Sequence, residues 1–361
     1  MKCIRYLSFL LITACIGIPV QAQSEQRVIE FIQLLDSLRI EAHIPGLSVA
    51  VVKNQEVVYA GGLGYSNPEK KIPASAETVY DVASVAKPIS AVVALRLNEE
   101  GVLNLDQPMS DYSEWTDFCS EFSEQPSIFA RDLQCNPSDH TLRHLLSHTA
   151  TGKPGTRFLY NPVLYSWASR PVMEAAEAQF SDLVKQYVFE PARMTHSARR
   201  YRDLPLRNDL AQLLAPGHII DLSGTAKPAP EPGPQGDGAA GGVITTVLDL
   251  TRFDIALDQG KLISVKSRKI MMTPFQTDGG DLLPYGIGWF VEEYHGQTLI
   301  WHSGWWEDAY SALYLKIPDL DLTFIILANS EGIWWNNSLD EAEVYRSTFA
   351  RAFLEAFAGE Y

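Results

Sequence analysis

Ser84 and Lys87, three positions apart, are the residues best suited to covalent chemistry in this sequence. A serine hydroxyl is a poor nucleophile unless a neighbouring base takes its proton. Residues i and i+3 of a helix lie on one face, with Cβ atoms roughly 5–6 Å apart, so Lys87 can reach Ser84 without help from the rest of the fold. The lysine is a base only when neutral, a state that burial and nearby positive charge favour by lowering its pKa. The pair predicts an activated serine that forms an acyl-enzyme.

The Ser-x-x-Lys spacing by itself is a weak signal, because ordinary composition produces about one such pair in a chain of this size. It occurs once here, and its surroundings strengthen it. Ser84 follows an extended segment, 78–83, and opens a predicted helix over Val85–Glu100, with Pro88 in the first turn and Gly101 at the stop. The backbone N–H groups at the start of that helix favour an oxyanion at the substrate carbonyl.

Strand patterns gather at the two ends of the chain. After an amphipathic helix over Ser24–Ala42, Leu47–Val52 and Val57–Ala60 predict an antiparallel hairpin. Three later strands are expected, at Gln297–His302, Ala309–Ile317 and Leu322–Ala328. Helices are expected before them at Leu142–Ser147, at Pro171–Phe189 and after a capping box at Thr246–Asp249, and one after them through Phe349, Phe353 and Phe357.

This distribution predicts an α+β fold, in which an antiparallel sheet flanked by helices carries an inserted, mainly helical lobe. The expected sheet lobe covers about 27–75 and 241–361, and the helical lobe about 76–240. Functional sites often lie in a cleft between lobes. A Pro-rich loop at 227–236 is a candidate border of that cleft, since long irregular loops in compact domains are often functional.

Four segments, in order, resemble the motifs of serine β-lactamase-like proteins. The segment containing Ser84 and Lys87 resembles the nucleophile motif, and the last resembles a strand motif that is Lys-Thr-Gly in true β-lactamases and often His-x-Gly in related esterases and D-aminopeptidases. The segments are Tyr80–Pro88, Leu142–Thr149, Pro154–Tyr160 and His302–Gly304. The resemblance covers nearly all of residues 27–357, points to the class C branch, and implies a β-lactamase/penicillin-binding-protein-like fold.

By this resemblance Tyr160 is a second general acid/base that shares the proton of Ser84 with Lys87. His302 lines the cleft and orients substrate, and the backbone amides of Ser84 and of Trp305, which follows Gly304, form the oxyanion hole. The structural alternatives are a packed core tyrosine at 160 and an exposed strand-end histidine at 302.

Two departures from the family pattern bear on the substrate. The Tyr-x-Asn motif reads Tyr160, Asn161, Pro162, so the Asn amide that would hold a substrate amide is missing from its place. Trp305, Trp306 and Glu307 stand where a small residue is usual, which indicates a narrowed acyl pocket or simply packing. The missing Asn and the histidine of the strand motif favour small acyl esters over β-lactams or D-amino-acid peptides, which stay as alternatives. A non-catalytic penicillin-binding or scaffold protein is the alternative from another class.

Other motifs predict less. His144 and His148 have the spacing of a helical metal pair but no third ligand, so no metal and no cofactor is expected. Trp334 and Trp335 fit a sugar-stacking platform or, more commonly, a turn packed against the last helix. Trp301 in place of a glycine before His302-Ser303 excludes the Gly-x-Ser-x-Gly pattern of α/β-hydrolases.

Residues 1–22 predict a secretory signal peptide cut after Ala22, and hence a periplasmic or secreted protein without a transmembrane anchor. A lipobox ending at Cys15 is the less favoured alternative. Removing these residues takes away Lys2 and Arg5 and no acid, which changes the formal charge from −15 to −17 and argues against nucleic acid as a partner. The partner expected is a small acyl substrate, and no oligomeric state is predicted.

Cysteine usage fits an oxidising compartment. Cys3 and Cys15 fall in the signal, leaving Cys119 and Cys135 as a candidate disulfide or as two free thiols. A bridge would close a loop of about 16 residues and stabilise the fold by roughly 3 kcal/mol.

Overall fold

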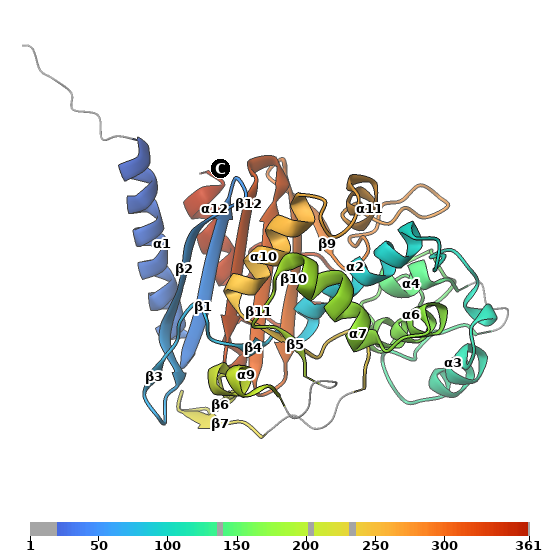
Figure 1. Ribbon diagram of the computed structural model, residues 1–361, viewed down its shortest axis with the longest axis horizontal. Coiled ribbons are helices and arrows are strands. Elements are labelled where there is room, and N and C mark those ends of the chain that lie inside the picture. Colours follow the sequence, from blue (N-terminus) through green and yellow to red (C-terminus); the bar gives the residue numbers. More distant parts are fainter. Residues whose placement is uncertain (1–19, 136–139, 201–205, 231–235, 360–361) are drawn as a thin grey trace, which may run out of the picture.

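The computed structural model describes residues 20–135, 140–200, 206–230 and 236–359 (Figure 1). Residues 1–19 of the predicted signal peptide, with Cys3 and Cys15, and residues 231–235 of the Pro-rich loop lie outside the described residues. The helices are α1 Val20–Glu41, α2 Ala86–Glu99, α3 Trp115–Ser123, α4 Leu142–Leu146, α5 Pro162–Trp167, α6 Ser169–Ala176, α7 Phe180–Val184, α8 Glu190–Ala192, α9 Asn208–Leu213, α10 Val247–Asp258, α11 Val265–Met271 and α12 Thr348–Phe357.

The described strands form a large antiparallel sheet in the order β3-β2-β1-β12-β11-β10-β9, with two small sheets, β4-β8-β5 and β6-β7. Strand β1 pairs with β2 on one side and with β12 on the other, with Leu47 opposite Ala328, so the two ends of the sequence share one sheet. The strands are β1 Gly46–Lys53, β2 Glu56–Asn67, β3 Ile72–Pro73, β4 Tyr80–Asp81, β5 Ala198–Arg199, β6 His218–Ile220, β7 Ala226–Pro228, β8 Val243–Thr245, β9 Phe290–Tyr294, β10 Gln297–Trp306, β11 Tyr310–Ile317 and β12 Leu322–Ala328.

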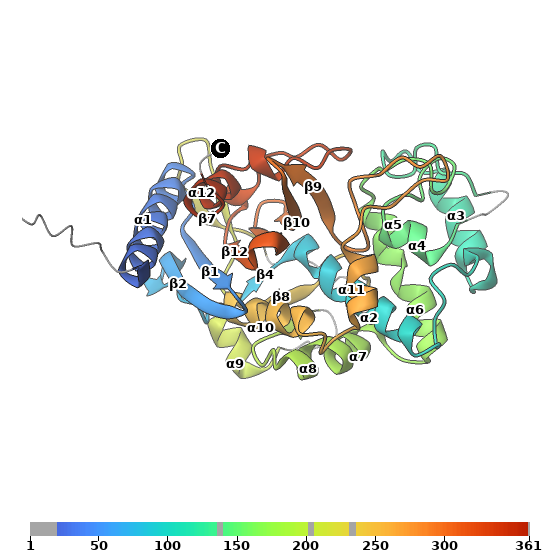
Figure 2. The same cartoon turned by 90° about the horizontal axis from the view of Figure 1, so that it is seen from above.

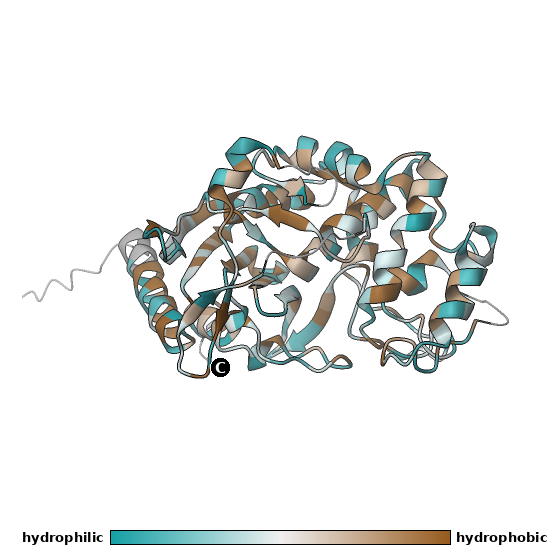
Figure 3. Cartoon of the chain, turned by 90° about the horizontal axis from the view of Figure 1, so that it is seen from below, coloured by the Kyte–Doolittle hydropathy of each residue, from teal (hydrophilic) through white to brown (hydrophobic). Residues whose placement is uncertain are grey.

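Helices cover both faces of the large sheet, which explains why nearly all of β1 and β12 is apolar and why their polar residues Ser48 and Thr323 are buried. Val49 and Val51 pack in a core with α1 and α12, whereas Ala50 packs in the core that contains α2 and α10. Figure 2 shows α1 and α12 on one side of the strands and α10 on the other. Along the helices, hydrophobic and hydrophilic residues alternate, as expected of amphipathic helices (Figure 3).

The segment between β4 and β8 is mainly helical and extends to one end of the molecule, where α3, α4 and α6 lie (Figure 1). The prediction of an α+β fold with an inserted helical lobe is therefore confirmed, while the residue boundaries of the two lobes stay a prediction. The helical pattern over Pro171–Phe189 is not one helix: α6 ends at Glu177, whose φ of 51° is left-handed, and α7 starts at Phe180. The predicted hairpin and the three C-terminal strands are present as β1–β2 and β10–β12.

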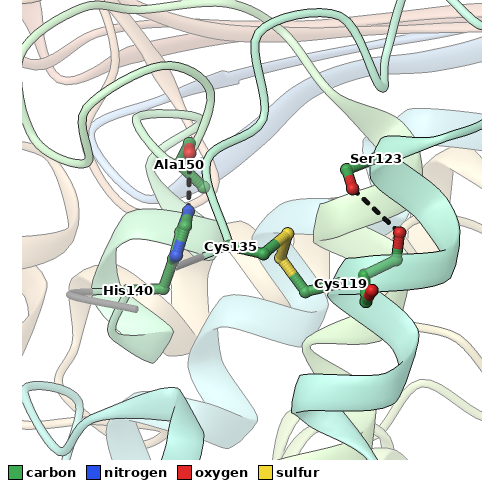
Figure 4. The surroundings of a disulfide bond; sticks show 6 residues. Cys119, Ser123, Cys135, His140 and Ala150 are labelled. Atoms are coloured by element: carbon green, nitrogen blue, oxygen red, sulfur yellow. Dashed lines mark hydrogen bonds between the residues drawn. A yellow bond between two sulfur atoms is a disulfide. The ribbon is translucent and has the colours of Figure 1, made fainter. Parts of the chain in front are cut away.

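In the helical lobe Cys119 of α3 and Cys135 form a disulfide (Figure 4). Nearby, the ring of His140 is hydrogen-bonded to the backbone carbonyl of Ala150, with 2.8 Å between Nε2 and the oxygen. Within the ranges that the structure describes, no helix is both long and apolar enough to cross a membrane.

Candidate active site

Ser84 lies in a tight turn, Ala83–Val85, between the short strand β4 and helix α2. Ala83 has a φ of 45°, a left-handed conformation that costs an L-residue free energy and persists only where neighbours hold it. Here the backbone N–H of Ala83 donates to Oδ1 of buried Asp81 at 2.9 Å, and Oδ2 of Asp81 lies 3.7 Å from Nη1 of Arg200. Pairing of β4 with β8 fixes Asp81 opposite Ile244. This network places Ser84 at the N-terminal end of α2.

Lys87 is fully buried, and its Nζ lies 2.8 Å from Oγ of Ser84 and 3.1 Å from the carbonyl oxygen of Ala240. Burial lowers the pKa of Lys87 well below its usual value, because the charged form loses its water. Lys316 is the contrast: it is also buried, but it is paired with Asp254 and Asp258, whose charges outweigh burial and raise its pKa. Lys87 therefore has the environment of a neutral amine, able to accept a proton from Ser84.

Tyr160 is half-buried beside this pair, with its ring centroid 4.9 Å from Nζ of Lys87. Burial raises the pKa of Tyr160, and a hydrogen bond with Ser84 opposes that rise in part. The backbone N–H of Tyr160 donates to the carbonyl of Leu339 at 3.0 Å, so the segment before α12 holds the tyrosine in place. Sequence reasoning missed a second tyrosine, Tyr165, whose hydroxyl donates to the carbonyl of Lys87 at 3.0 Å.

Strand β10 lies against the nucleophile turn at Gly304. A Cβ on Gly304 would stand 2.2 Å from the carbonyl oxygen of Val82, so only glycine lets the strand approach this closely. The geometry brings the backbone of Trp305 to the turn that contains Ser84.

His302 lies within β10 and is only 1% exposed, so the exposed strand-end alternative is wrong. Its Nδ1 is 2.6 Å from the carbonyl oxygen of Ser303, and its Nε2 is 2.9 Å from Oη of Tyr285. Because a carbonyl only accepts, Nδ1 carries the hydrogen and Nε2 accepts from the tyrosine hydroxyl. Burial lowers the pKa of His302 well below its usual value, which keeps the ring neutral. Both ring nitrogens thus face protein groups.

Trp305 is 42% exposed and stacks on Trp334, with ring centroids 5.6 Å apart. Its indole N–H donates to Oε2 of Glu331 at 2.8 Å. Trp335 packs against Trp301 at 5.7 Å. Trp334 therefore stacks with Trp305, whereas Trp335 packs against the core of the sheet.

Asn161, His144 of α4 and His148, which follows α4, have structural partners. Asn161 is buried, caps α5 by accepting from the N–H of Leu164 at 3.1 Å, and donates from Nδ2 to the carbonyl of Phe129 at 2.7 Å. His144 has its pKa lowered to about 4, mainly by burial, and its Nδ1 lies 3.1 Å from the N–H of Thr141. Nδ1 of His148 accepts from the N–H of Asn161 at 3.0 Å. Among the described residues no group of three or more His, Cys, Asp or Glu is arranged to hold a metal ion.

An antiparallel sheet between helical layers, with a serine and a buried lysine at the start of a central helix, defines the β-lactamase/penicillin-binding-protein fold. The chain belongs to the Beta-lactamase family, whose model matches residues 31–337. Penicillin-binding protein 4* of Bacillus subtilis (strain 168) is 23% identical in an alignment of 329 residues that covers 81% of this chain and 69% of that protein. Protein flp of Staphylococcus aureus (strain NCTC 8325 / PS 47) is also 23% identical, over 80% of this chain, but the match covers only 60% of its length.

Solved structures share the fold. The octameric penicillin-binding protein homologue from Pyrococcus abyssi superposes with a TM-score of 0.73 at 23% identity, over 91% of this chain and 77% of that one. The D-amino acid amidase from Ochrobactrum anthropi SV3, complexed with L-phenylalanine amide, superposes with a TM-score of 0.70 at 18% identity, over 92% of this chain and 99% of that one. At these identities the likeness extends to the fold alone.

Proposed function

We propose that the protein is an exported serine hydrolase that works through an acyl-enzyme on Ser84, with Lys87 as the base and Tyr160 as the second acid/base. The contact of 2.8 Å between Oγ of Ser84 and Nζ of a fully buried Lys87 carries this proposal. Burial keeps the lysine neutral, and the start of α2 supplies backbone dipoles for a developing negative charge.

The reaction follows from these positions. The Ser84 hydroxyl gives its proton to the Lys87 amine while Oγ bonds to the substrate carbonyl carbon, and the negative carbonyl oxygen is held by the backbone N–H groups of Ser84 and Trp305. The phenol of Tyr160 then donates a proton to the leaving group, whose bond to the carbonyl carbon breaks, and Tyr160 recovers a proton from Lys87. Water attacks the acyl-enzyme in the same way and releases the carboxylic acid.

Small acyl esters are the favoured substrates. Asn161 is buried as a helix cap, which supports the inference that no Asn side chain stands ready to hold a substrate amide at the family position. Trp305 and Trp334 add bulk beside the strand motif. The D-amino acid amidase of similar fold makes a D-amino-acid amide the second candidate, and β-lactams the third. His302 would act on substrate through Tyr285, the group its Nε2 contacts.

The first experiment is intact-mass spectrometry of the mature protein after exposure to a fluorophosphonate, with Ser84→Ala and the exposed-serine variant Ser37→Ala beside it. Wild type and Ser37→Ala should each gain one adduct and Ser84→Ala none. Absence of an adduct on the wild type would remove the main support for catalysis. If a substrate acylates Ser84 and the acyl group is never hydrolysed, the non-catalytic penicillin-binding alternative is favoured.

Substrate preference is tested by steady-state comparison of short acyl esters, a D-amino-acid amide and a chromogenic cephalosporin on the same preparation. We expect the highest kcat/KM for an ester. A higher kcat/KM for the cephalosporin would reject the ester preference and leave the nucleophile assignment intact.

Export is tested by sequencing the N-terminus of the protein from the expressing cells. Cleavage after Ala22 gives Gln23 as the first residue, in a periplasmic or secreted fraction. A lipid-modified Cys15 would instead identify a lipoprotein.

A further inference from the structure

Four consecutive backbone carbonyls beside Lys87 are each bound by a side chain. They belong to Gly238, Ala239, Ala240 and Gly241, which we call the 238–241 segment. Arg199 donates to the oxygens of Gly238, at 2.7 Å, and Gly241. Between them, Ser90 Oγ donates to Ala239 at 2.7 Å and Lys87 Nζ to Ala240 at 3.1 Å. The N–H of Ala239 also donates to the carbonyl of Ser166 in α5 at 3.0 Å. This short loop is thereby fixed on both sides.

Arg199 is the buried clamp of this segment. It is 1% exposed, belongs to β5 opposite Val243 of β8, and its guanidinium carbon lies 5.5 Å from the ring centroid of Phe180. Its Nη2 is 3.4 Å from Oδ1 of Asp237, a carboxylate that also accepts from both the N–H and the hydroxyl of Ser181 in α7. A planar guanidinium can bridge two separated acceptors in fixed geometry, whereas a lysine ammonium carries its three donors on one nitrogen at the end of a flexible stem.

We propose that Arg199 is a positioning residue for Lys87: by bridging the carbonyls of Gly238 and Gly241 it holds the Ala240 carbonyl where that oxygen takes one N–H of the Lys87 amine and leaves the lone pair facing Ser84. The inference rests on the proposed function, since it assumes that Lys87 is the base. A neutral amine has two hydrogens and one lone pair, so an acceptor at 3.1 Å on one side sets the direction of the lone pair toward the oxygen at 2.8 Å.

The same segment closes the surroundings of Lys87 against water. On its other sides lie Tyr160 and Tyr165, with ring centroids 4.9 and 5.3 Å from Nζ. His148 and His302 are close enough that their charged forms would repel a protonated Lys87, and burial lowers the pKa of both rings. Burial is the cause of the lowered pKa of Lys87, so a segment that moves away and admits water should let that pKa rise toward its ordinary value. The lysine would then be protonated at neutral pH and unable to accept the serine proton.

The test is the rate of fluorophosphonate labelling of Ser84 as a function of pH, in wild type and Arg199→Lys. The variant keeps the positive charge but cannot bridge both carbonyls. In the variant we expect the pKa of Lys87 to rise, so that the acid limb of the profile moves to higher pH by roughly one unit or more. Labelling should then be about tenfold slower at pH 7 and much less affected at pH 10. A structural defect alone would lower the labelled fraction equally at all pH values.

Arg268→Lys is the matched control, because Arg268 also donates to two backbone carbonyls, those of Leu257 and Asp258 at the end of α10. Its profile should coincide with that of wild type. Ser90→Ala, which removes only the bond to Ala239, should shift the limb in the same direction by less, and it decides the matter if Arg199→Lys does not fold. An unshifted limb in the folded variant, or an equal shift in Arg268→Lys, overturns the proposal. Since wild type labelled at Ser84 is the reference, these outcomes leave the proposed nucleophile standing.

Discussion

Lys87 is buried beside Ser84, and taking its charge out of water costs folding free energy unless a partner ion compensates. Lys316 has such partners in Asp254 and Asp258, whereas Lys87 has the hydroxyl of Ser84, the carbonyl of Ala240 and the aromatic rings around it. At the scale of single residues, the property that makes Lys87 a base is therefore also a source of instability.

Replacing Lys87 with methionine should stabilise the protein at neutral pH while abolishing the labelling of Ser84. The folded-state pKa of Lys87 is lowered, so between that value and its ordinary pKa near 10.5 the unfolded chain binds a proton that the native protein does not. Wild type should lose about 1.4 kcal/mol per pH unit relative to the variant as pH falls through this range. Denaturant unfolding at pH 7 and pH 10 measures the difference, which should be smaller at pH 10.

The exposed-lysine variant Lys261→Met serves as the control and should change stability little at either pH. A difference between Lys87→Met and wild type that is constant from pH 7 to pH 10 would show that Lys87 is charged in the folded protein.

At the scale of elements, the close approach of β10 to the turn before Ser84 depends on Gly304. Gly304→Ala places a Cβ 2.2 Å from the carbonyl oxygen of Val82, which must move. We expect a stability loss of about 1–3 kcal/mol and a large fall in Ser84 labelling, measured by thermal unfolding and intact mass. Gly279→Ala, whose Cβ would meet nothing nearer than 3.6 Å, is the control. Normal labelling in Gly304→Ala would mean that β10 does not set the geometry of the turn.

The stacked pair Trp305 and Trp334 should limit the size of the acyl group. Trp305→Ala removes an indole but keeps the backbone N–H proposed for the oxyanion hole, so labelling of Ser84 should persist. The kcat/KM of a long-chain ester relative to an acetyl ester should rise about tenfold, as expected for a few methylenes admitted to an apolar pocket. Glu331→Gln, which keeps an oxygen for the indole N–H, should leave the ratio unchanged. An unaltered ratio in Trp305→Ala would place the acyl group elsewhere.

Local patterns in the sequence predicted those elements whose signals are local. The β-rich runs of β1 and β2, the helical pattern after Ser84 and the capping of α10 by Thr246 are properties of a few neighbouring residues, and each is present in the structure. The small sheet β4-β8-β5 and the hydrogen bonds of Arg199 to residues 238 and 241 were not predicted from the sequence. They join residues about 40 to 160 positions apart, and two-residue strands show no periodicity. The contact between His302 and Tyr285 was missed as well, because a single side-chain contact leaves no periodic pattern in the sequence.

At the scale of the whole molecule, the sheet is assembled from both ends of the sequence, since β1 lies between β2 and β12. The helix pair α1 and α12 covers one face, where Phe31 contacts the rings of Phe324, Phe353 and Phe357 at centroid distances of 5.5, 6.0 and 5.1 Å. The other face carries α2 with Ser84 and Lys87. A loss of packing on the α1 side should therefore reach the candidate site through the sheet.

Phe31→Ala tests this coupling. Phe31 is 2% exposed, and truncating a buried phenylalanine costs about 3–5 kcal/mol. We expect the change in tryptophan fluorescence and the loss of Ser84 labelling to occur in one transition, at a lower temperature than in wild type. The reason is that the central strands β1, β11 and β12 contribute side chains to both cores. Ile29→Ala, at a position 51% exposed on the same helix, should leave the transition in place. If labelling survives in Phe31→Ala above the temperature at which fluorescence changes, the helical lobe and its serine hold together without the α1 layer, and the two lobes unfold separately.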